Sequence, residues 1–153
     1  MDQQVMVKIK HLEHAEPGEN PLEYATPNSA GVDLRAWPKD TQVSLPPGER
    51  YPFPTGIALE ITKAGVAGFI FSRSGLGTKQ GLVVSQGVGV IDPDYRGEII
   101  VSLLNNSLES RTVSRGQRIA QLIFMPWVQA KFQVAQELSS TERGSGGFGH
   151  TGN

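Results

Sequence analysis

The sequence predicts an all-β domain, a jelly roll or β-clip barrel of short strands with one short helix and a flexible, glycine-rich C-terminal arm. The chain of 153 residues contains 18 glycines and 10 prolines, a composition that favours many tight turns. Apolar residues recur in short runs, and no window sustains a helical apolar stripe for three turns. A chain of this length is expected to form one domain.

The first expected strand lies near the N-terminus, where Val5, Val7 and Ile9 alternate with residues that include two lysines. This alternation predicts a strand with one basic face. Short apolar runs bounded by glycine, proline or polar residues predict the remaining strands. They are expected over residues 42–45, 51–61, 67–72, 83–91, 98–104 and 119–125, with the helix over 74–80.

Two further segments complete the expected organisation. Residues 92–97, Asp-Pro-Asp-Tyr-Arg-Gly, are typical of a hairpin turn between two of these strands. Residues 132–135 are the last apolar stretch, and from about residue 139 glycine dominates over apolar anchors. A segment of that composition is mobile when it has nothing to pack against. We therefore expect a jelly-roll domain over residues 1–138 and a mobile arm over residues 139–153.

Cysteine content and charge exclude several classes of protein. The chain has no cysteine, which excludes disulfides and cysteine-ligated metals. Its formal net charge is −1, whereas a nonspecific nucleic-acid binder is usually basic over a whole face. Without a signal peptide or a membrane-spanning run, we expect a soluble, intracellular protein that is cytoplasmic by default. Asn105-Asn106-Ser107 fits a glycosylation sequon, but we interpret it as a chance match.

The C-terminal arm carries the sequence Arg-Gly-Ser-Gly-Gly-Phe-Gly from Arg143 to Gly149. Its G-x-G-x-x-G spacing lacks the following helix of a dinucleotide-binding fold, so that interpretation fails. Arg143 can pair with a phosphate and Phe148 can stack on a base. The intervening glycines let backbone N–H groups approach an anion closely. The alternative is a disordered terminus without function.

The segment Ser-Arg-Ser-Gly-Leu-Gly at residues 72–77 lies at the expected junction between a strand and the helix. N–H groups at a helix start carry partial positive charge, so Arg73, a hydroxyl and a glycine at this junction can hold an anion. The alternative is an ordinary helix N-cap with an exposed arginine.

Three polar residues interrupt apolar sequence. Asp92 directly follows small and apolar residues, and a carboxylate held beside a water molecule can deprotonate it for attack on phosphorus. A turn-capping aspartate before Pro93 is the alternative. Asp33 and Gln121 also lie in apolar surroundings, where polar groups need partners, so both can be purely structural.

Other catalytic patterns are missing from the sequence. Three dispersed histidines without cysteine do not predict a zinc site. The chain contains neither a G-x-S-x-G nucleophile elbow nor a G-x-x-x-x-G-K-[ST] phosphate loop.

Five segments together resemble the five motifs of the trimeric dUTPase family, in the family's order. They are residues 30–36, 72–77, 85–98, 116–122 and 143–152, and they include Gly-Val-Ile-Asp-Pro-Asp-Tyr-Arg-Gly and Arg-Gly-Ser-Gly-Gly-Phe-Gly. The resemblance implies a β jelly roll that forms a homotrimer and hydrolyses dUTP to dUMP and pyrophosphate. That activity keeps uracil out of DNA and supplies dUMP for thymidylate synthesis. The sequence departs from the family pattern at Ser72, Gln86 and His150.

The resemblance also implies roles for individual residues. Asp92 is the expected general base, which activates a water molecule for attack on the α-phosphorus. Mg²⁺ chelated by the triphosphate would neutralise developing charge, with Asp33 as its partner through bound water. Phe148 would stack over uracil, and Tyr95 would pack under the sugar and exclude a 2′-hydroxyl. The expected substrate-binding residues are Arg73, Ser74, Gly75, Gln86, Gly89, Val90, Ile91, Tyr95, Ile100, Gln121, Arg143, Ser145, Phe148 and Gly149.

Base selection and assembly follow from the same resemblance. Backbone groups of a rigid hairpin near Gly89–Ile91 and Ile100 are expected to match the N3–H and O4 of uracil. Cytosine reverses that edge, so its binding would leave these groups unpaired. Each site is expected to combine three chains. One chain would supply Asp33, Arg73, Ser74, Gly75 and Gln121, a second the 85–100 hairpin, and the third its arm.

Two alternatives remain open on the sequence. A dCTP deaminase shares the fold and an Ile-Asp-Pro stretch, but it resembles this chain less because it lacks the glycine-rich arm. A regulatory protein built on the same scaffold would have no need to keep Asp92, Tyr95, Arg73 and Phe148 together.

Overall fold

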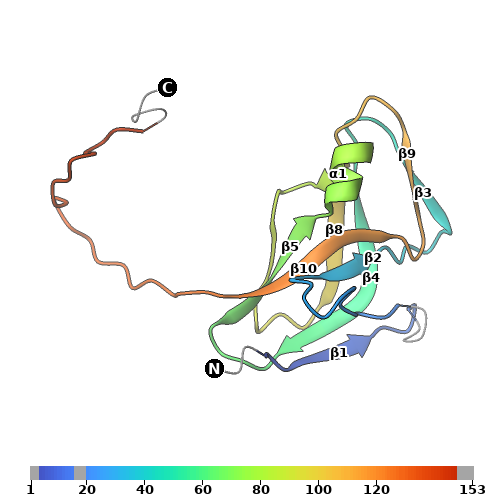
Figure 1. Cartoon of the computed structure of the whole chain (residues 1–153), viewed down its shortest axis with the longest axis horizontal. Helices are drawn as coiled ribbons and strands as arrows, with labels where there is room; N and C mark the ends of the chain where they lie inside the picture. The colour runs from blue at the N-terminus through green and yellow to red at the C-terminus, as the bar shows by residue number, and fades with distance from the viewer. Residues whose placement is uncertain (1–3, 16–19, 148–153) are drawn as a thin grey trace.

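Two four-stranded antiparallel sheets and a two-stranded ribbon form the body of the protein (Figure 1). The computed structural model describes residues 4–15 and 20–147. The first sheet has the order β1 (Val7–His11), β4 (Arg50–Ile61), β8 (Glu98–Asn105) and β6 (Leu82–Val84). The second has the order β2 (Val32–Arg35), β10 (Arg118–Pro126), β5 (Val66–Ser72) and β7 (Gly89–Ile91). The ribbon pairs β3 (Gln42–Leu45) with β9 (Arg111–Ser114), and the predicted all-β class is confirmed.

The hydrophobic core collects the inward-facing residues of these strands. In β8, Ile99, Val101 and Leu103 are buried and alternate with more exposed neighbours, as expected for a strand with one face on the core. Phe53 of β4 and Leu122 of β10 are also fully buried and belong to the same cluster. Burying one such side chain contributes about 1.5–3 kcal/mol, so the core fixes how the strands that carry the candidate site are placed.

The single helix, α1 (Ser74–Gln80), agrees with the predicted bounds. Leu76 is its buried anchor, and Gly81 ends it in the left-handed conformation with φ 69°. A side chain at Gly81 would also meet Ser107. Glycine is the residue that adopts this conformation without strain, so the helix stops after two turns and the chain enters β6.

The segment 83–91 was expected to be one strand, and that expectation is wrong. The chain turns between β6 and β7 at Gly87, whose φ is 82° and whose N–H donates to the carbonyl of Val84 at 3.0 Å. β6 pairs with β8 in the first sheet, whereas β7 pairs with β5 in the second. The turn therefore carries the chain from one sheet to the other, and Ser85-Gln86-Gly87 between two apolar stretches was the signal for it in the sequence.

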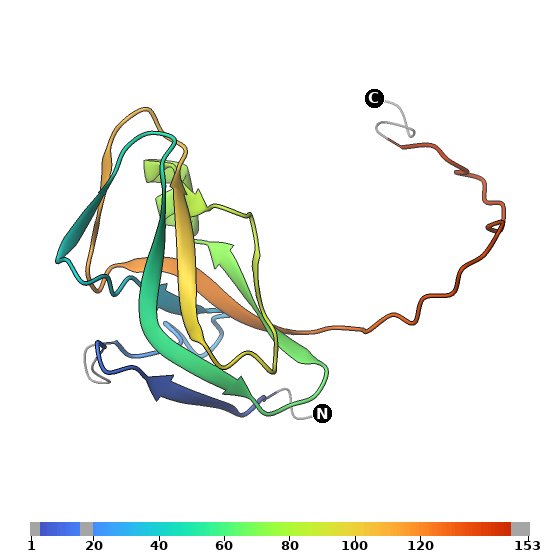
Figure 2. The ribbon, with the colours of Figure 1, turned by 180° about the vertical axis from the view of Figure 1, so that it is seen from behind.

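The hairpin expected around residues 92–97 is wrong for the same reason. β7 and β8 belong to different sheets, and the described structure has no pairing between them. Figure 2 shows β8 in yellow beside the long strand β4 in green, its actual partner. Residues 92–97 thus form a loop that connects the sheets, and we call them the β7–β8 loop.

The possible glycosylation site is a structural residue. Asn105 is fully buried, and its amide nitrogen donates to the carbonyls of Leu45 and Glu109 at 2.7 and 2.8 Å. Its side-chain oxygen accepts hydrogen bonds from both the N–H and the hydroxyl of Ser107. A side chain that is used at both ends in the core is not an acceptor for a glycan, which agrees with a chance match.

After Pro126 the chain leaves the sheets and extends away from them through residue 147 (Figure 1). Phe132, Val134 and Leu138 are 93%, 100% and 91% exposed, so the last apolar stretch has nothing to pack against within one chain. The division expected at residue 138 stays a prediction. No helix in residues 4–15 and 20–147 is long and apolar enough to cross a membrane.

Candidate active site

One cluster of polar residues lies on the outer face of the second sheet. Gln121 of β10 stands opposite Asp33 of β2 on one side and Phe71 of β5 on the other. Directly opposed residues of antiparallel strands point to the same face. The next register position, Leu34 opposite Ala120, is buried in the core, so Asp33 and Gln121 point outward together.

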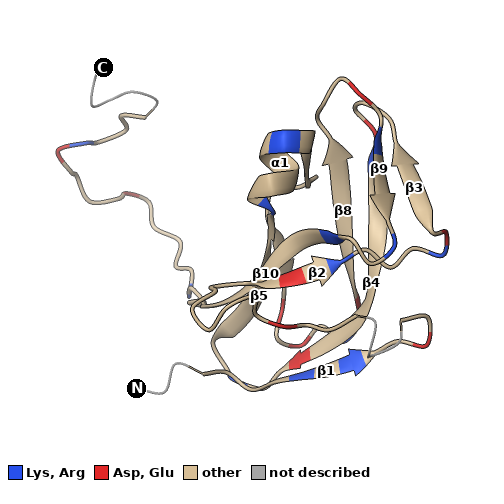
Figure 3. Ribbon diagram, turned by 45° about the vertical axis from the view of Figure 1, so that its right-hand side comes forward, with Lys and Arg blue, Asp and Glu red and all other residues tan. Residues whose placement is uncertain are grey.

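Asp33 holds two arginines at this face. Its Oδ1 accepts a hydrogen bond from Nε of Arg73 at 2.7 Å, and its Oδ2 accepts one from Nη1 of Arg118 at 3.1 Å. A register irregularity between Arg118 and Ala120 accompanies this contact. Figure 3 shows the acidic position on β2 among basic positions of the neighbouring elements. One carboxylate between two guanidinium groups leaves a net positive charge, which favours binding of an anion.

Ser74 and Gly75 follow Arg73 at the start of α1. Arg73 is the N-cap residue, and the helix has no side-chain cap hydrogen bond. The first N–H groups of a helix have no partner within it. Arg73 does occupy the N-cap position, as the alternative expected, but its side chain is half-buried and ion-paired with Asp33 rather than freely exposed.

Ser72, where the sequence departs from the family pattern, has a structural role. Its hydroxyl accepts a hydrogen bond from the N–H of Val84 at 2.8 Å, which ties β5 to β6. Arg118 was not singled out from the sequence. The sequence feature that could have identified Arg118 as a site residue is its position three residues before Gln121 in segment 116–122.

The β7–β8 loop presents Asp92 to solvent. The carbonyl of Asp92 accepts a hydrogen bond from the N–H of Tyr95 at 3.1 Å, and Arg96 donates to the carbonyl of Pro93 at 2.7 Å. The turn expected by the alternative interpretation is therefore present, but it uses the backbone of Asp92. Within the described residues the carboxylate makes no hydrogen bond, which leaves it available to a water molecule.

Unpaired backbone edges lie next to this loop. β7 is the last strand of its sheet, so one edge of Gly89–Ile91 has no neighbouring strand in the described structure. β6 pairs with β8 only at residues 103–105, so the β8 backbone near Ile100 lacks a partner on that side. Free donors and acceptors on a strand edge can bind the edge of a base. The side chains of Val90 in β7 and Ile100 in β8 are exposed.

Tyr95 is folded back onto the loop that carries it. Its hydroxyl donates to the carbonyl of Glu98 at 2.9 Å, and a Cβ at Gly97 would collide with its ring. Gly97 was not among the predicted site residues, although glycine directly after Tyr-Arg was visible in the sequence. Gln86 is exposed, and its side-chain oxygen accepts a hydrogen bond from the hydroxyl of Ser85.

A single chain does not bring the predicted site residues together. Ile91 pairs with Gly68 near the start of β5, whereas Arg73 follows the end of that strand. Asp92 continues past Ile91 to the level of Ala67, six residues before Arg73, so at about 3.3 Å per residue the two are separated by roughly 20 Å along β5. Arg143 and Ser145 are exposed on the extended arm, where Nε of Arg143 donates to the carbonyl of Gly146 at 2.9 Å. Phe148 and Gly149 lie outside the described residues.

The protein itself offers little for direct metal binding. Residues 4–15 and 20–147 contain no group of three or more histidine and acidic side chains placed to hold a metal ion. Both oxygens of Asp33 accept hydrogen bonds from arginine. This donor set fits a cation that arrives on a polyphosphate, with Asp33 as an acidic partner through water, rather than a cation caged by protein ligands.

The fold and site define a class of all-β protein with an outward-facing arginine pair, an unbonded aspartate on a loop and a glycine-rich arm. The dUTPase family model matches residues 20–152. A deoxyuridine 5'-triphosphate nucleotidohydrolase of Desulfitobacterium hafniense is 47% identical over 148 residues, 97% of each chain. The chain belongs to the dUTPase family, a family of hydrolases, and the resemblance seen in the five segments is confirmed.

Solved structures agree with this assignment. A mutant dUTPase of Staphylococcus bacteriophage 80alpha with dUpNHpp has a TM-score of 0.83 and 26% identity, covering 97% of this chain and 99% of that one. A mutant dUTPase of phage phi11 of S. aureus shares the fold with a TM-score of 0.75 at 23% identity, covering 88% of this chain and 99% of that one. That phi11 protein coordinates a structural Mg(II) ion.

Proposed function

We propose that the protein hydrolyses dUTP to dUMP and pyrophosphate. The observation that carries the proposal is the exposed, unbonded carboxylate of Asp92 on the β7–β8 loop of a chain that matches the dUTPase family over residues 20–152. Its relatives support the substrate, because one is named for this nucleotide and another is solved with dUpNHpp.

Asp92 acts as the general base in this proposal. Its carboxylate takes a proton from a water molecule as the water oxygen bonds to the α-phosphorus. The bond between the α-phosphorus and the oxygen that bridges to the β-phosphorus breaks, and pyrophosphate leaves with that oxygen. The turn hydrogen bond through the Asp92 backbone supports the role, because it fixes the residue without using its side chain.

The arginine cluster binds the phosphates. Arg73, Ser74, Gly75 and Gln121 are the proposed ligands, and the net positive charge around Asp33 favours a triphosphate. Asp33 aligns the guanidinium of Arg73 by accepting from its Nε; Nη1 makes a long hydrogen bond of 3.5 Å to the carbonyl of Arg118, and Nη2 is left for an anion. On the arm, Arg143 and Ser145 are proposed to contact the phosphates from another side, while Phe148 and Gly149 complete the base pocket.

Selectivity for deoxyuridine rests on the β7–β8 region. The unpaired backbone edges of Gly89–Ile91 and Ile100 supply fixed donors and acceptors for the N3–H and O4 of uracil. A base with the reversed pattern leaves those groups unpaired, which costs about 1–3 kcal/mol for each buried group. Tyr95 limits the space beside the sugar, and Gln86 on the preceding turn is a further proposed contact.

Mg²⁺ is the proposed cofactor. When bound to the triphosphate it neutralises charge that develops on the phosphate oxygens. Asp33 would be its partner through water, since the described residues offer no direct ligand cage.

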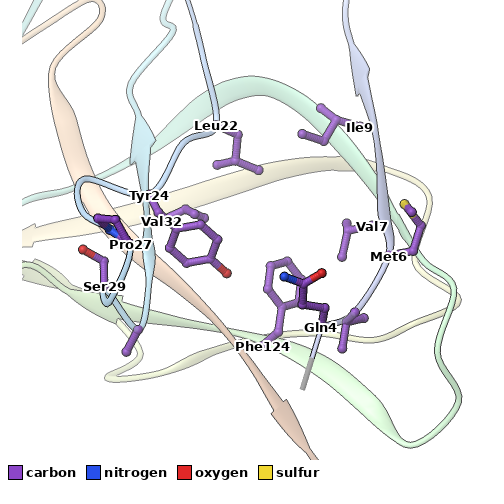
Figure 4. Close-up of a pocket in the computed structure, with 12 residues that line it drawn as sticks. Gln4, Met6, Val7, Ile9, Leu22, Tyr24, Pro27, Ser29, Val32 and Phe124 are labelled. Carbon is purple, nitrogen blue, oxygen red and sulfur yellow. The ribbon is translucent and has the colours of Figure 1, made fainter. Parts of the chain in front are cut away.

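A homotrimer with shared sites explains why one chain separates Asp92 from Arg73. A groove of mixed polarity beside β1 supports this assembly, and Figure 4 shows that apolar residues of its lining, such as Ile9, Leu22 and Phe124, lie beside the polar Gln4 and Ser29. We propose that residues 127–138 of a second copy fill this groove, because Phe132, Val134 and Leu138 have no cover in their own chain. The arm that follows then reaches a neighbouring site.

Incubating the purified chain with dUTP and Mg²⁺, and measuring pyrophosphate and dUMP, tests the proposal directly. We expect dUTP to be consumed far faster than UTP, dCTP or dTTP. The dCTP reaction separates the nearest alternative, since a deaminase releases ammonia from dCTP. Absence of pyrophosphate from dUTP would contradict the enzyme proposal and favour a regulatory scaffold.

A further inference from the structure

A β-bulge in β4 lies opposite the start of β8, where the β7–β8 loop ends. Pro54 pairs with Ile100 and Ala58 pairs with Glu98, so β4 has extra residues between these two positions. Gly56 in the bulge has φ 70°, and a Cβ there would collide with that of Ala15. A bulge leaves backbone groups without ladder partners, so its hydrogen bonds need other acceptors and donors.

Glu98 supplies the acceptor for this bulge. Its Oε1 accepts a hydrogen bond from the N–H of Gly56 at 2.7 Å and lies 3.0 Å from Nε2 of His14. The Glu98 side chain is only 21% exposed. A hydrogen bond from a backbone N–H to a carboxylate is stronger than one between neutral groups, so the first residue of β8 is fixed to β4 through its side chain.

Further hydrogen bonds around the bulge make the connection between β4 and Glu98 rigid. The hydroxyl of Thr55 donates to the carbonyl of Ile99 at 2.7 Å, and the amide of Asn20 donates to the carbonyl of Thr55 at 2.6 Å. The carbonyl of Gly56 accepts from the N–H of Leu12 at 2.8 Å. The bulge is therefore satisfied on all sides, and movement of Glu98 would leave the Gly56 N–H without its partner.

The same residue also holds Tyr95. The carbonyl of Glu98 accepts the hydrogen bond of the Tyr95 hydroxyl at 2.9 Å, and the ring of Tyr95 lies against Gly97. The side chain of Glu98 thus fixes the backbone that fixes the tyrosine. The orientation of Tyr95 is set from β4, across the sheet, rather than by the β7–β8 loop alone.

We propose that Glu98 is a positioning residue for sugar selectivity. By joining the end of the β7–β8 loop to the β4 bulge, it holds Tyr95 in the orientation that excludes the 2′-hydroxyl of ribonucleotides. Its carboxylate does not contact substrate and acts only through Tyr95 and the β8 backbone. This inference rests on the proposed dUTP hydrolysis.

The test compares kcat and KM for dUTP and UTP in the full-length protein and its variants. Glu98→Ala is expected to lower the dUTP-to-UTP ratio of kcat/KM by about tenfold to a hundredfold, as misplacement of a distant group does. The change in the ratio should come mainly from the KM values and not from kcat. Glu98→Gln is expected to remain within about threefold of the unmodified chain, since its amide oxygen still accepts from Gly56. Glu60→Ala, which removes an exposed carboxylate paired with Lys8 on the same sheet, is the matched control and should leave the ratio unchanged.

A double variant separates positioning from general stability. If Glu98 acts through Tyr95, the effects of Glu98→Ala and Tyr95→Phe on the ratio will be clearly less than additive. Additive effects, an unchanged ratio in Glu98→Ala, or an equal loss in Glu98→Gln would overturn the inference. Should Glu98→Ala fail to fold, Glu98→Asp withdraws the carboxylate by one methylene and must lower the ratio. An unmodified chain that does not hydrolyse dUTP contradicts the proposed function instead.

Discussion

At the residue scale, the proposed role of Asp92 as general base predicts that its loss will lower turnover but not nucleotide binding. Asp92→Asn keeps the size of the side chain and the turn hydrogen bond of the backbone, but an amide cannot take the proton of the attacking water. We expect kcat for dUTP to fall by about a hundredfold to ten thousandfold, with nucleotide binding retained. Calorimetry with a non-hydrolysable dUTP analogue checks binding, and unchanged turnover would remove Asp92 from the role of base.

Gly56 gives a second prediction at this scale, about stability. Gly56→Ala must accept a positive φ and a collision with Ala15, and we expect it to lower the free energy of unfolding by about 3 kcal/mol. Ala15→Gly removes the collision but not the strain of the positive φ. The double variant should therefore recover part of the loss in a denaturant titration, and no recovery would mean that Ala15 is not the obstacle.

The sequence identified Asp33, Arg73 and Gln121 as isolated polar positions, and the structure explains why they matter together. The pairing of β2 with β10 places Asp33 and Gln121 on one face, and Arg73, directly after β5, reaches Asp33 by a hydrogen bond. Such contacts are long-range, and alternation within one segment does not report them. Arg118 and Glu98 were missed because each is an ordinary surface charge in its own segment. Their significance comes from partners 85 and 42 positions away in the chain.

At the element scale, most strand positions were predictable, but β2 and β9 were missed and strand partners could not be predicted. The bounds of β3, β10 and α1 follow from local apolar pattern and turn residues. The division of 83–91 into β6 and β7 depends on one turn at Gly87, and the expected hairpin failed because the two strands flanking residues 92–97 join different sheets. This arrangement leaves one edge of β7 and one side of β8 near Ile100 without a strand partner, which the proposed site uses.

The C-terminal arm is the element with the clearest functional prediction. Truncation after Ser140 removes Arg143 and the glycine-rich sequence but keeps residues 127–138, which are proposed to hold the assembly. We expect kcat/KM for dUTP to fall by about a hundredfold, as loss of anion-stabilising donors does, with the oligomer unchanged by light scattering. Arg143→Ala should produce part of this loss, and full activity of the truncated chain would show that the arm is dispensable.

At the scale of the whole molecule, the proposed activity depends on chains that share a site. The roughly 20 Å between Asp92 and Arg73 along β5 cannot be closed within one rigid sheet. The exposed apolar residues of 127–138 and the groove beside β1 indicate how copies can associate. The proposed trimer of the 16.5 kDa chain would place the loop of one copy near the arginine cluster of the next.

Complementation between two inactive variants tests this central claim most directly. Asp92→Asn and Arg73→Ala are each expected to be nearly inactive toward dUTP alone. When the two chains are co-expressed and assemble at random, roughly a quarter of the shared sites contain both native residues, so dUTP hydrolysis should return to roughly that fraction of the unmodified level. If both residues of a site come from one chain, every site in the mixture stays defective, and mixing that restores no activity would contradict the account.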